Sequence, residues 1–397
     1  MKSKLKYLLL FLILNNLTAA SQENPAADVY LLTCGPGTET YSVYGHSALR
    51  IVIPEKESDL VYNWGVFDFN TPNFAWKFAK GRLSYSLGVS TYDNFLRDYY
   101  LEKRWVVSQK LNLESDEVEK LFQLIGENLK PENINYRYDF FYDDCSTRIR
   151  DLIEKSVGDN LLWPPGEETR NMPTFRQLTG KYEEVFPWTK VGIDLLMGSP
   201  GDKKASFRDR MFLPVEMKDG LSELQIRRQG KTIPLLANPV LVLDFDQLAF
   251  RKNLFTTPFF VFCILLIIMI MLTGFFRGKK SSSIIDITVF SIFSVLAILM
   301  IFFNFFTDHQ QMKWNLNIIW LNPFIILCLL SLILKKDSLV WFRIVFFLAA
   351  GFLVSLVVLP QSINNAFVPL IGILILRSSA RANFFWNPLT IPYLTQL

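Results

Sequence analysis

The chain has 397 residues, half of them apolar, and a formal net charge of +4 at pH 7, which is too small to argue for a nucleic-acid partner. Four cysteines without a CxxC pair and only two histidines exclude a disulfide-stapled scaffold and make a metal site unexpected. The sequence also lacks the Gly-rich loops that hold nucleotide cofactors, so we expect no cofactor.

The N-terminus predicts a signal peptide. Three lysines among the first six residues precede a short apolar run at residues 7–14, and small residues follow at 18–20. The apolar run is too short to span a bilayer, so we expect residues 1–20 to be removed by cleavage after Ala20. An uncleaved N-terminal anchor is the alternative.

Residues 21–250 mix charged, polar and apolar residues as a globular domain does. Alternating apolar residues and intervening turns predict strands at residues 29–33, 47–53, 60–67, 82–90 and 104–113. Helical periodicity predicts helices at residues 92–100 and 114–129, the second capped just before Asp116, and a further helix from residue 145. We expect residues 163–186 to be irregular and residues 224–236 to form a hairpin that turns at Gly230. This order of elements predicts an α+β domain.

His46 stands at the start of a predicted strand, directly after Gly45. Alternation places His46 and Ala48 on one face of this strand and Ser47 and Leu49 on the other. A small neighbour on its own face leaves room for another group to approach His46, and a neutral imidazole can act as a general base. A structural histidine is the alternative.

A catalytic histidine is usually oriented by a third polar group. Asn63, on the next predicted strand, is the first candidate, and Asp68 is the second. An asparagine that satisfies backbone groups at a strand end is an equal alternative for Asn63. Tyr44 or Tyr142 could line an oxyanion site, although tyrosines also occur as core residues.

Cys145 lies at the start of a predicted helix, and apolar residues follow it at spacings of four, seven and eight. Asp144 precedes it and can cap the helix. The free amides and the positive end of the helix dipole stabilise a thiolate at such a position and can hold an oxyanion. A buried, inert cysteine is the alternative. Together with His46, the one histidine of the predicted soluble domain, Cys145 forms a candidate nucleophile–base pair.

Cys34 is the other cysteine of the predicted soluble domain, and it precedes the turn formed by residues 35–37. It could serve as the nucleophile or pair with Cys145 in an oxidising compartment. No helix signal follows it, so nothing in the sequence lowers the pKa of its thiol.

Apolar runs long enough to cross a bilayer, which takes about 20 residues, begin after residue 250. We expect an all-α bundle at residues 251–380 and a cytoplasmic tail at residues 381–397. About five spans are predicted, at residues 254–276, 284–306, 316–334, 339–359 and 363–376.

Basic residues decide the orientation of these spans. They follow the first, third and fifth spans as Arg277, Lys279, Lys280, Lys335, Lys336, Arg377 and Arg381. The loops after the second and fourth spans are poor in basic residues. We therefore expect the basic side to be cytoplasmic, and the soluble domain and the loops that hold His309 and Gln361 to lie outside an inner membrane. The His309 loop could grip a lipid head group or act only as an interfacial anchor.

Three segments resemble the N-terminal periplasmic domain of the Lnb proteins, the lipoprotein N-acyltransferases of Bacteroidota. They are LLTCGPGTETYSVYGHSALRI around His46, YDFFYDDCSTRIRD around Cys145, and MFLP at residues 211–214. TDHQQMKWNLNIIWLNP, at residues 307–323, resembles their membrane part. More distantly, a strand histidine followed by a helix-opening cysteine is similar to the circularly permuted papain-like fold of NlpC-type hydrolases and lecithin:retinol acyltransferases.

The resemblance implies a thiol-dependent acyl transfer in the periplasm. Cys145 would take an acyl chain from a membrane phospholipid as a thioester, and the α-amino group of a diacylated lipoprotein's N-terminal cysteine would accept it. His46 would be the base and Asn63 its orienting group. One alternative is a hydrolase with the same Cys–His pair that cuts a peptidoglycan amide or a phospholipid ester. Another is a non-enzymatic envelope scaffold.

Overall fold

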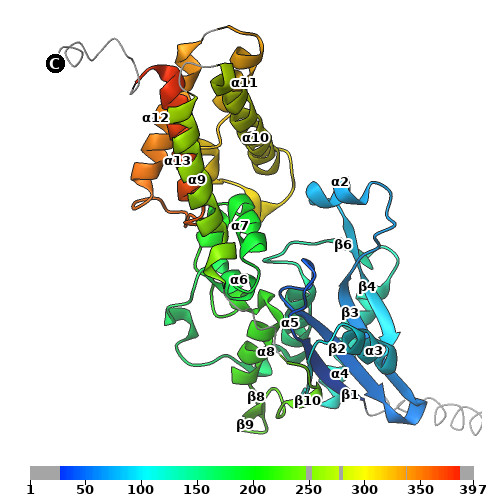
Figure 1. The fold of residues 1–397 in the computed structure, drawn as a ribbon. Coiled ribbons are helices and arrows are strands. Elements are labelled where there is room, and N and C mark those ends of the chain that lie inside the picture. Colours follow the sequence, from blue (N-terminus) through cyan, green and yellow to red (C-terminus); the bar gives the residue numbers. More distant parts are fainter. Residues whose placement is uncertain (1–26, 247–252, 277–279, 337, 385–397) are drawn as a thin grey trace, which may run out of the picture.

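The computed structural model describes residues 27–246, 253–276, 280–336 and 338–384. The predicted signal peptide, the predicted domain boundary near residue 250 and most of the predicted tail lie outside these ranges. The described chain forms a sheet-containing soluble part and a bundle of apolar helices at one end of it (Figure 1). The predicted α+β class of the soluble part, followed by helices, is confirmed.

A seven-stranded antiparallel sheet forms the centre of the soluble part, with strand order β10-β5-β1-β2-β3-β4-β6. Its strands are β1 Asp28–Cys34, β2 His46–Ile53, β3 Ser58–Val66, β4 Ser84–Thr91, β5 Val106–Lys110, β6 Asn135–Arg137 and β10 Val240–Leu243. The five predicted strands are present as β1 to β5. The edge strands β6 and β10 are too short for alternation to reveal.

Seven helices and a small second sheet accompany the main sheet in the described soluble part. The helices are α2 Phe74–Ala79, α3 Tyr92–Leu101, α4 Ser115–Leu129, α5 Cys145–Val157, α6 Phe175–Glu183, α7 Pro187–Leu196 and α8 Pro214–Glu223. The small sheet consists of β7 Leu161–Leu162, β8 Gln225–Arg228 and β9 Lys231–Pro234. The predicted hairpin is confirmed, because β8 and β9 pair and Gly230 adopts φ +79° in the turn between them.

Two details of the predicted helices are wrong. The N-cap of α4 is Glu114, one residue earlier than predicted, because it forms a capping box with Glu117. Residues 163–186 are not irregular throughout, since they contain α6. Thr174 caps this helix by accepting a hydrogen bond from Gln177 N at 3.2 Å, and the aromatic ring of Phe175 is buried in the first turn.

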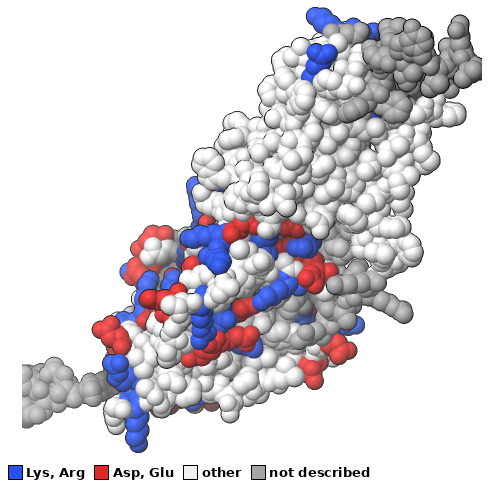
Figure 2. Space-filling model, turned by 90° about the vertical axis from the view of Figure 1, so that its left-hand side faces the viewer, with Lys and Arg blue, Asp and Glu red and all other residues white. Residues whose placement is uncertain are grey.

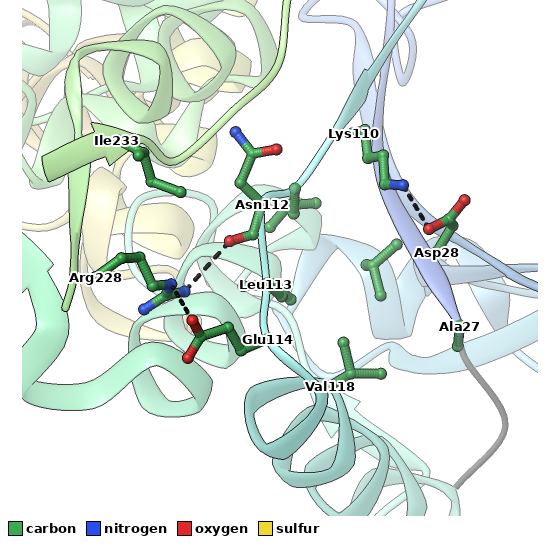
Figure 3. Close-up of a pocket in the computed structure, with 11 residues that line it drawn as sticks. Ala27, Asp28, Lys110, Asn112, Leu113, Glu114, Val118, Arg228 and Ile233 are labelled. Carbon is green, nitrogen blue, oxygen red and sulfur yellow. Dashed lines mark hydrogen bonds and ion pairs between the residues drawn. The ribbon is translucent and has the colours of Figure 1, made fainter. Parts of the chain in front are cut away.

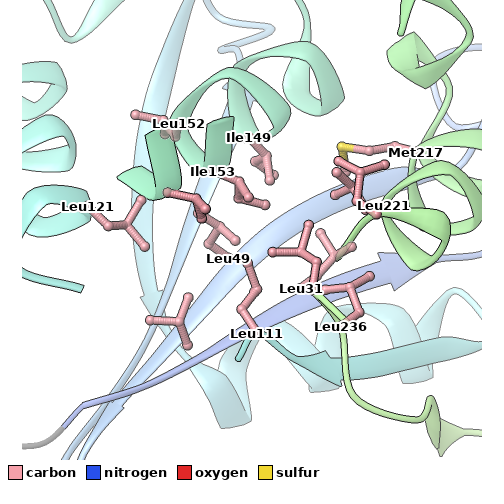
Figure 4. Packing of buried hydrophobic residues seen from close by; sticks show 14 of the residues in the cluster. Leu31, Leu49, Leu111, Leu121, Ile149, Leu152, Ile153, Met217, Leu221 and Leu236 are labelled. Carbon is pink, nitrogen blue, oxygen red and sulfur yellow. The ribbon is translucent and has the colours of Figure 1, made fainter. Parts of the chain in front are cut away.

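The two faces of the sheet are covered by different helices. Figure 4 shows Leu49 of β2 packed against Ile149 and Ile153 of α5, with α4 and α8 at the sides of this cluster. Ala48 belongs instead to a cluster with Phe95 of α3 on the opposite face. The alternation predicted for β2 is therefore confirmed. Each fully buried aliphatic side chain contributes about 1.5–3 kcal/mol, so this packing fixes α5 against β2.

The apolar bundle contains α9 Pro258–Phe275, α10 Lys280–Phe305, α11 Phe324–Ile333, α12 Leu339–Ser355 and α13 Phe367–Ala382. Three described stretches are long and apolar enough to cross a membrane, namely Pro258–Phe275, Ser282–Phe305 and Leu316–Ile333. The helix α12 is apolar but shorter. Figure 2 shows a broad surface without charged side chains between the charged soluble part and the Lys and Arg side chains at the far end of the bundle.

The helix α13 extends past residue 376, the predicted end of the fifth span, and includes Arg377 and Arg381. The Arg377 side chain is buried and donates to Asp286 Oδ1 of α10 at 2.7 Å and to Thr273 Oγ1 of α9 at 2.6 Å. Arg381 donates to Asp286 Oδ2 at 2.5 Å. A buried carboxylate thus compensates both arginines, which allows the helix to continue past them.

The loop between α10 and α11 is hydrogen-bonded to the soluble part. Gly198 N donates to Gln311 O at 2.8 Å, and Asn315 Nδ2 donates to Leu195 O at 2.8 Å. A Cβ atom at Gly198 would lie 1.9 Å from the Lys313 carbonyl oxygen, so only glycine permits this approach. In Figure 1, α6 and α7 lie between the sheet and the bundle, and the loop meets the soluble part there.

Candidate active site

The helix α5 begins at Cys145 because Asp144 caps it, as predicted. Asp144 Oδ1 accepts a hydrogen bond from Thr147 N at 2.8 Å, and Thr147 Oγ1 accepts one from Asp144 N at 2.7 Å. Both capping side chains are buried. This reciprocal cap fixes the first turn of α5 and therefore the position of the Cys145 thiol.

Cys145 is 7% exposed, and its sulfur lies against backbone amides. Burial raises the pKa of this thiol, while the N–H groups of Ser47 and Ser146, together with the Ser146 hydroxyl 3.8 Å away, act in the opposite direction. The amides thus act on the thiolate in the expected direction, while burial opposes them and leaves the pKa of the Cys145 thiol raised.

His46 opens β2 and is hydrogen-bonded through Nε2 to Asn63 Oδ1 of β3, the first candidate for an orienting group. An amide oxygen only accepts, so Nε2 carries the proton and Nδ1 keeps its lone pair. Burial lowers the pKa of His46 to about 4, although the hydrogen bond to Asn63 raises it. The imidazole is therefore neutral at neutral pH.

Ser47 connects the histidine strand to the cysteine helix. Its hydroxyl lies 3.3 Å from the Ser146 hydroxyl, and its backbone acts to lower the pKa of the Cys145 thiol. The residue that follows His46 thus contacts the first turn of α5. Among the contacts of the described residues, no hydrogen bond joins the His46 ring to the thiol. Such catalytic hydrogen bonds often tighten only when substrate binds.

The other candidate residues are engaged elsewhere. Tyr44 donates to Glu183 at 2.8 Å, and Tyr142 is 48% exposed. Asp68 accepts hydrogen bonds from the backbone and side chain of Asn70 within its own turn. None of the three has a contact with Cys145 or His46 among the described residues.

A tyrosine that sequence reasoning missed lies beside the thiol. A Cβ atom at Gly65 of β3 would be 3.8 Å from Cys145 Cβ and 3.9 Å from Tyr136 Oη, so the missing side chain leaves space between the thiol and this hydroxyl. Tyr136 Oη is buried and has no hydrogen-bond partner among the described residues, and the Arg148 guanidinium lies 3.5 Å over its ring. In the sequence, the glycine at position 65 is the local signal of this opening, and in the structure it adopts φ +92°.

Comparison with known families bears on this arrangement. A family model described as the Lnb N-terminal periplasmic domain matches residues 16–180, and one described as the Lnb transmembrane domain matches residues 250–385. The chain belongs to the Lnb family. It is a membrane protein with a periplasmic N-terminal domain, and the Lnb match to that domain contains His46, Asn63 and Cys145. Searches of curated proteins and of solved structures find no match.

In this Lnb protein Cys34 is a buried core residue. Burial raises the pKa of its thiol to about 12, and it is 0% exposed among residues packed against α3. All four cysteines, Cys34 and Cys145 included, are free. Cys34 thus has neither the solvent access nor the helix start that Cys145 has.

A pocket of about 340 Å³ lies elsewhere on the Lnb protein (Figure 3). Asp28, at the beginning of β1, lines this pocket. Cys34 ends the same strand and lies opposite His46 in the register of β1 with β2. Seven residues at about 3.3 Å each separate the two ends by roughly 20 Å. Two ion pairs lie within the lining of the pocket, Lys110 with Asp28 and Arg228 with Glu114. Within the described ranges, no three His, Cys, Asp or Glu residues group as a metal site.

Proposed function

We propose that this Lnb protein is a lipoprotein N-acyltransferase in which Cys145 is the nucleophile, His46 the base and Asn63 the orienting group. The observation that carries the proposal is the placement of a capped helix start with its thiol beside β2, whose first residue is held by Asn63. The domain that holds these groups is hydrogen-bonded to a membrane bundle, where both lipid substrates would be found.

In the first half-reaction, His46 Nδ1 takes the proton of the Cys145 thiol as the sulfur attacks an ester carbonyl of a phospholipid. The tetrahedral intermediate collapses with loss of the lysophospholipid alkoxide, which takes the proton back from His46. The product is an acyl thioester on Cys145. Because both groups are neutral at rest, proton transfer accompanies the attack and no stable ion pair precedes it.

In the second half-reaction, the α-amino group of a diacylated lipoprotein's N-terminal cysteine attacks the thioester. His46 takes a proton from this nitrogen and returns it to the leaving sulfur, which restores the thiol and leaves an amide on the lipoprotein. Asn63 keeps Nδ1 as the free ring nitrogen in both steps, because it holds the proton on Nε2.

We infer that the N–H groups of Ser47 and Ser146 and the Tyr136 hydroxyl stabilise the oxyanion of both tetrahedral intermediates. The two amides act to lower the pKa of the Cys145 thiol, and Tyr136 Oη has no hydrogen-bond partner within the described part of the chain. Donors that are held in place before charge develops stabilise a transition state strongly, since they need no reorganisation.

We further infer a circularly permuted papain-like domain above five membrane crossings. The histidine strand precedes the cysteine helix in the chain, and that helix packs on the sheet. The loops after α10 and α12 contact the soluble part, so the other end of the bundle, which holds Lys335 and Lys336, faces the cytoplasm of an inner-membrane protein.

Mass spectrometry of a synthetic diacylated lipopeptide, incubated with the full-length protein in phospholipid vesicles, tests the proposal. The lipopeptide should gain one acyl group at its α-amine with wild type and with Cys34→Ser, and none with Cys145→Ser. Without lipopeptide, Cys145 should carry an acyl thioester.

Release of free fatty acid with no change to the lipopeptide would replace the transferase with a hydrolase. Equal behaviour of wild type and Cys145→Ser would point to a non-enzymatic scaffold. The Cys34→Ser control separates loss of the nucleophile from a general effect of removing a buried thiol.

A further inference from the structure

The connection between β3 and β4, residues 67–83, carries an unusual number of exposed rings. We call it the aromatic finger. Phe69 is 62% exposed, Trp76 of α2 is 57% exposed and Phe78 is 53% exposed. Phe69 and Phe78 belong to one ring cluster, because Phe74 contacts both, at 5.1 Å and 6.1 Å between centroids, whereas Trp76 contacts Phe302 of α10. Large contiguous apolar patches on a protein surface mark contact with a partner or a membrane.

The aromatic finger lies at the outer end of α10. The Trp76 ring is 5.5 Å from the ring of Phe302, which belongs to one of the stretches able to cross a membrane. Phe302 precedes the end of α10 at Phe305 by three residues, or about 5 Å along the axis. His309 Nε2 hydrogen-bonds the Phe78 carbonyl at 2.9 Å, so the following loop also holds the finger (Figure 1). Trp76 therefore sits at the depth of the outer leaflet boundary.

Basic side chains accompany these rings. Lys80 Nζ lies 5.0 Å over the Trp76 ring, and Arg82 donates to Asp308 at 2.8 Å just beyond the finger. Arg137 of β6 bonds the same carboxylate at 3.2 Å. Aromatic rings flanked by cations suit the zone where acyl chains meet phosphate groups. This chemistry points to a phospholipid as the occupant of the patch.

A row of rings leads from the aromatic finger to Cys145. Phe69 contacts Phe67 at 4.9 Å, Phe67 contacts Tyr85 of β4 at 5.4 Å, and Tyr85 contacts Tyr138 at 4.6 Å. A Tyr138 ring carbon in turn lies 3.9 Å from the position of a Cβ at Gly65, the glycine that opens space beside the thiol. The row thus has an exposed end at Phe69 and another end, at Tyr138, beside the opening that Gly65 leaves next to Cys145.

We propose that the aromatic finger inserts into the outer leaflet beside α10 and that the row from Phe69 to Tyr138 guides a phospholipid acyl chain to Cys145. The guidance rests on the proposed acyl transfer. The membrane contact does not, because it follows from the exposed rings and from the contact of Trp76 with α10.

Photo-cross-linking tests the membrane contact without any catalysis. p-Benzoylphenylalanine is placed at position 69, 76 or 100 of the full chain in vesicles of phosphatidylethanolamine and phosphatidylglycerol. Tyr100 is the matched control, because it is an exposed ring on α3. Lipid adducts are expected by mass spectrometry at 69 and 76 and not at 100. Equal yields at the three positions, or none at 69 and 76, would overturn the insertion.

Formation of acyl-Cys145 tests the guidance. Phe69→Asp, which removes the first ring of the row, and Trp76→Asp, which removes the ring beside α10, should each lower the rate from bilayer phospholipid by about tenfold or more. Both should leave the rate from water-soluble p-nitrophenyl butyrate within about twofold of wild type, and Tyr100→Asp should change neither rate. Unchanged phospholipid rates in the two finger variants would overturn the guidance.

An equal loss of rate from bilayer phospholipid and from p-nitrophenyl butyrate would also overturn the guidance, because the defect would then lie at Cys145 and the residues around it. If the wild type forms no acyl-Cys145 from either donor, the proposed acyl transfer and the guidance both fail. The cross-linking result still decides whether the aromatic finger contacts lipid.

Discussion

His46 can act as a base only while its ring is neutral, and burial determines the pH range in which this holds. The pKa is lowered to about 4, so the ring is competent above this pH and loses its lone pair as the pH falls through about 4. We expect kcat/KM for acyl transfer to stay level from neutral pH down to about pH 5 and to fall below it. An ordinary histidine would give a midpoint near 6.5.

The rate should be measured from pH 4 to 8 with circular dichroism at each pH to exclude unfolding. Unfolding is a concern here because a lowered histidine pKa also weakens folding as the pH falls from about 6.5 to about 4. A midpoint near 6.5 in a folded protein would contradict the assignment of His46 as a buried neutral base. Asn63→Ala, which removes the partner of Nε2, should lower the rate across the whole pH range.

The Tyr136 hydroxyl allows a second test at the residue scale, because it is a buried donor that has no partner in the ranges the structure describes. Tyr136→Phe should lower kcat by about 10²–10³ with little change in KM, as expected for a donor used only in the transition state. Tyr85→Phe is the control, since Tyr85 belongs to the aromatic row and is not assigned to the oxyanion site. Equal kcat for Tyr136→Phe and wild type would exclude the hydroxyl from the oxyanion site.

How far the sequence predicts these residues depends on whether their signal is local. The order of His46, Asn63 and Cys145 along strands and a capped helix is a local pattern, so the sequence suggests all three. Tyr136 lies on β6, a three-residue edge strand, and only the assembled sheet brings it beside the thiol. The raised pKa of Cys145 also requires the tertiary structure, because it comes from burial.

At the scale of elements, the strands β1 to β5 and the helices α3 and α4 follow their sequence patterns. The helices α2, α6, α7 and α8 are not predicted, although α3 is as short as α7 and α8. Pro187 and Pro214 stand at the first positions of α7 and α8, where proline is favoured, and mark their starts. The end of α13 is obscured for another reason. From the sequence alone Arg377 is expected in a loop, because its partner Asp286 lies on another helix.

At the scale of the whole molecule, the orientation of the catalytic domain above the bundle is determined by side chains that the sequence does not pair. Gln311, in the loop after α10, donates to Asp139 at 2.5 Å. Asp139 also accepts from the backbone of Phe141 and Tyr142 in the segment that leads into Cys145. These partners are 172 residues apart, and no period or motif links them. The bundle therefore does more than anchor the domain, since the loop after α10 supports the segment before Cys145.

Arg176 is the centre of a second junction. Its buried guanidinium donates to Asp194 at 3.2 Å and to Asp202 at 2.9 Å. These carboxylates also accept from Asn364 and from the backbone of Ser362, in the loop after α12, at 2.8 and 3.0 Å. One arginine thus compensates two buried carboxylates that hold the soluble part to the bundle.

Arg176→Met should destabilise the protein by about 3–5 kcal/mol, because it leaves the Asp202 carboxylate without its cation and leaves Asp194 with Lys190 alone. Hydrogen exchange should rise at residues 360–366 and stay unchanged in β1 to β3, if the loss is centred on the junction. Arg208→Met is the matched control, since Arg208 pairs with Asp151 and Glu154 while 40% exposed, and it should cost at most about 1 kcal/mol. Uniform protection across the chain in Arg176→Met would show that the two parts are joined mainly by other contacts. Selective loss at the loop, accompanied by slower acylation of Cys145 from bilayer phospholipid, would show that catalysis depends on how the domain is held over the membrane.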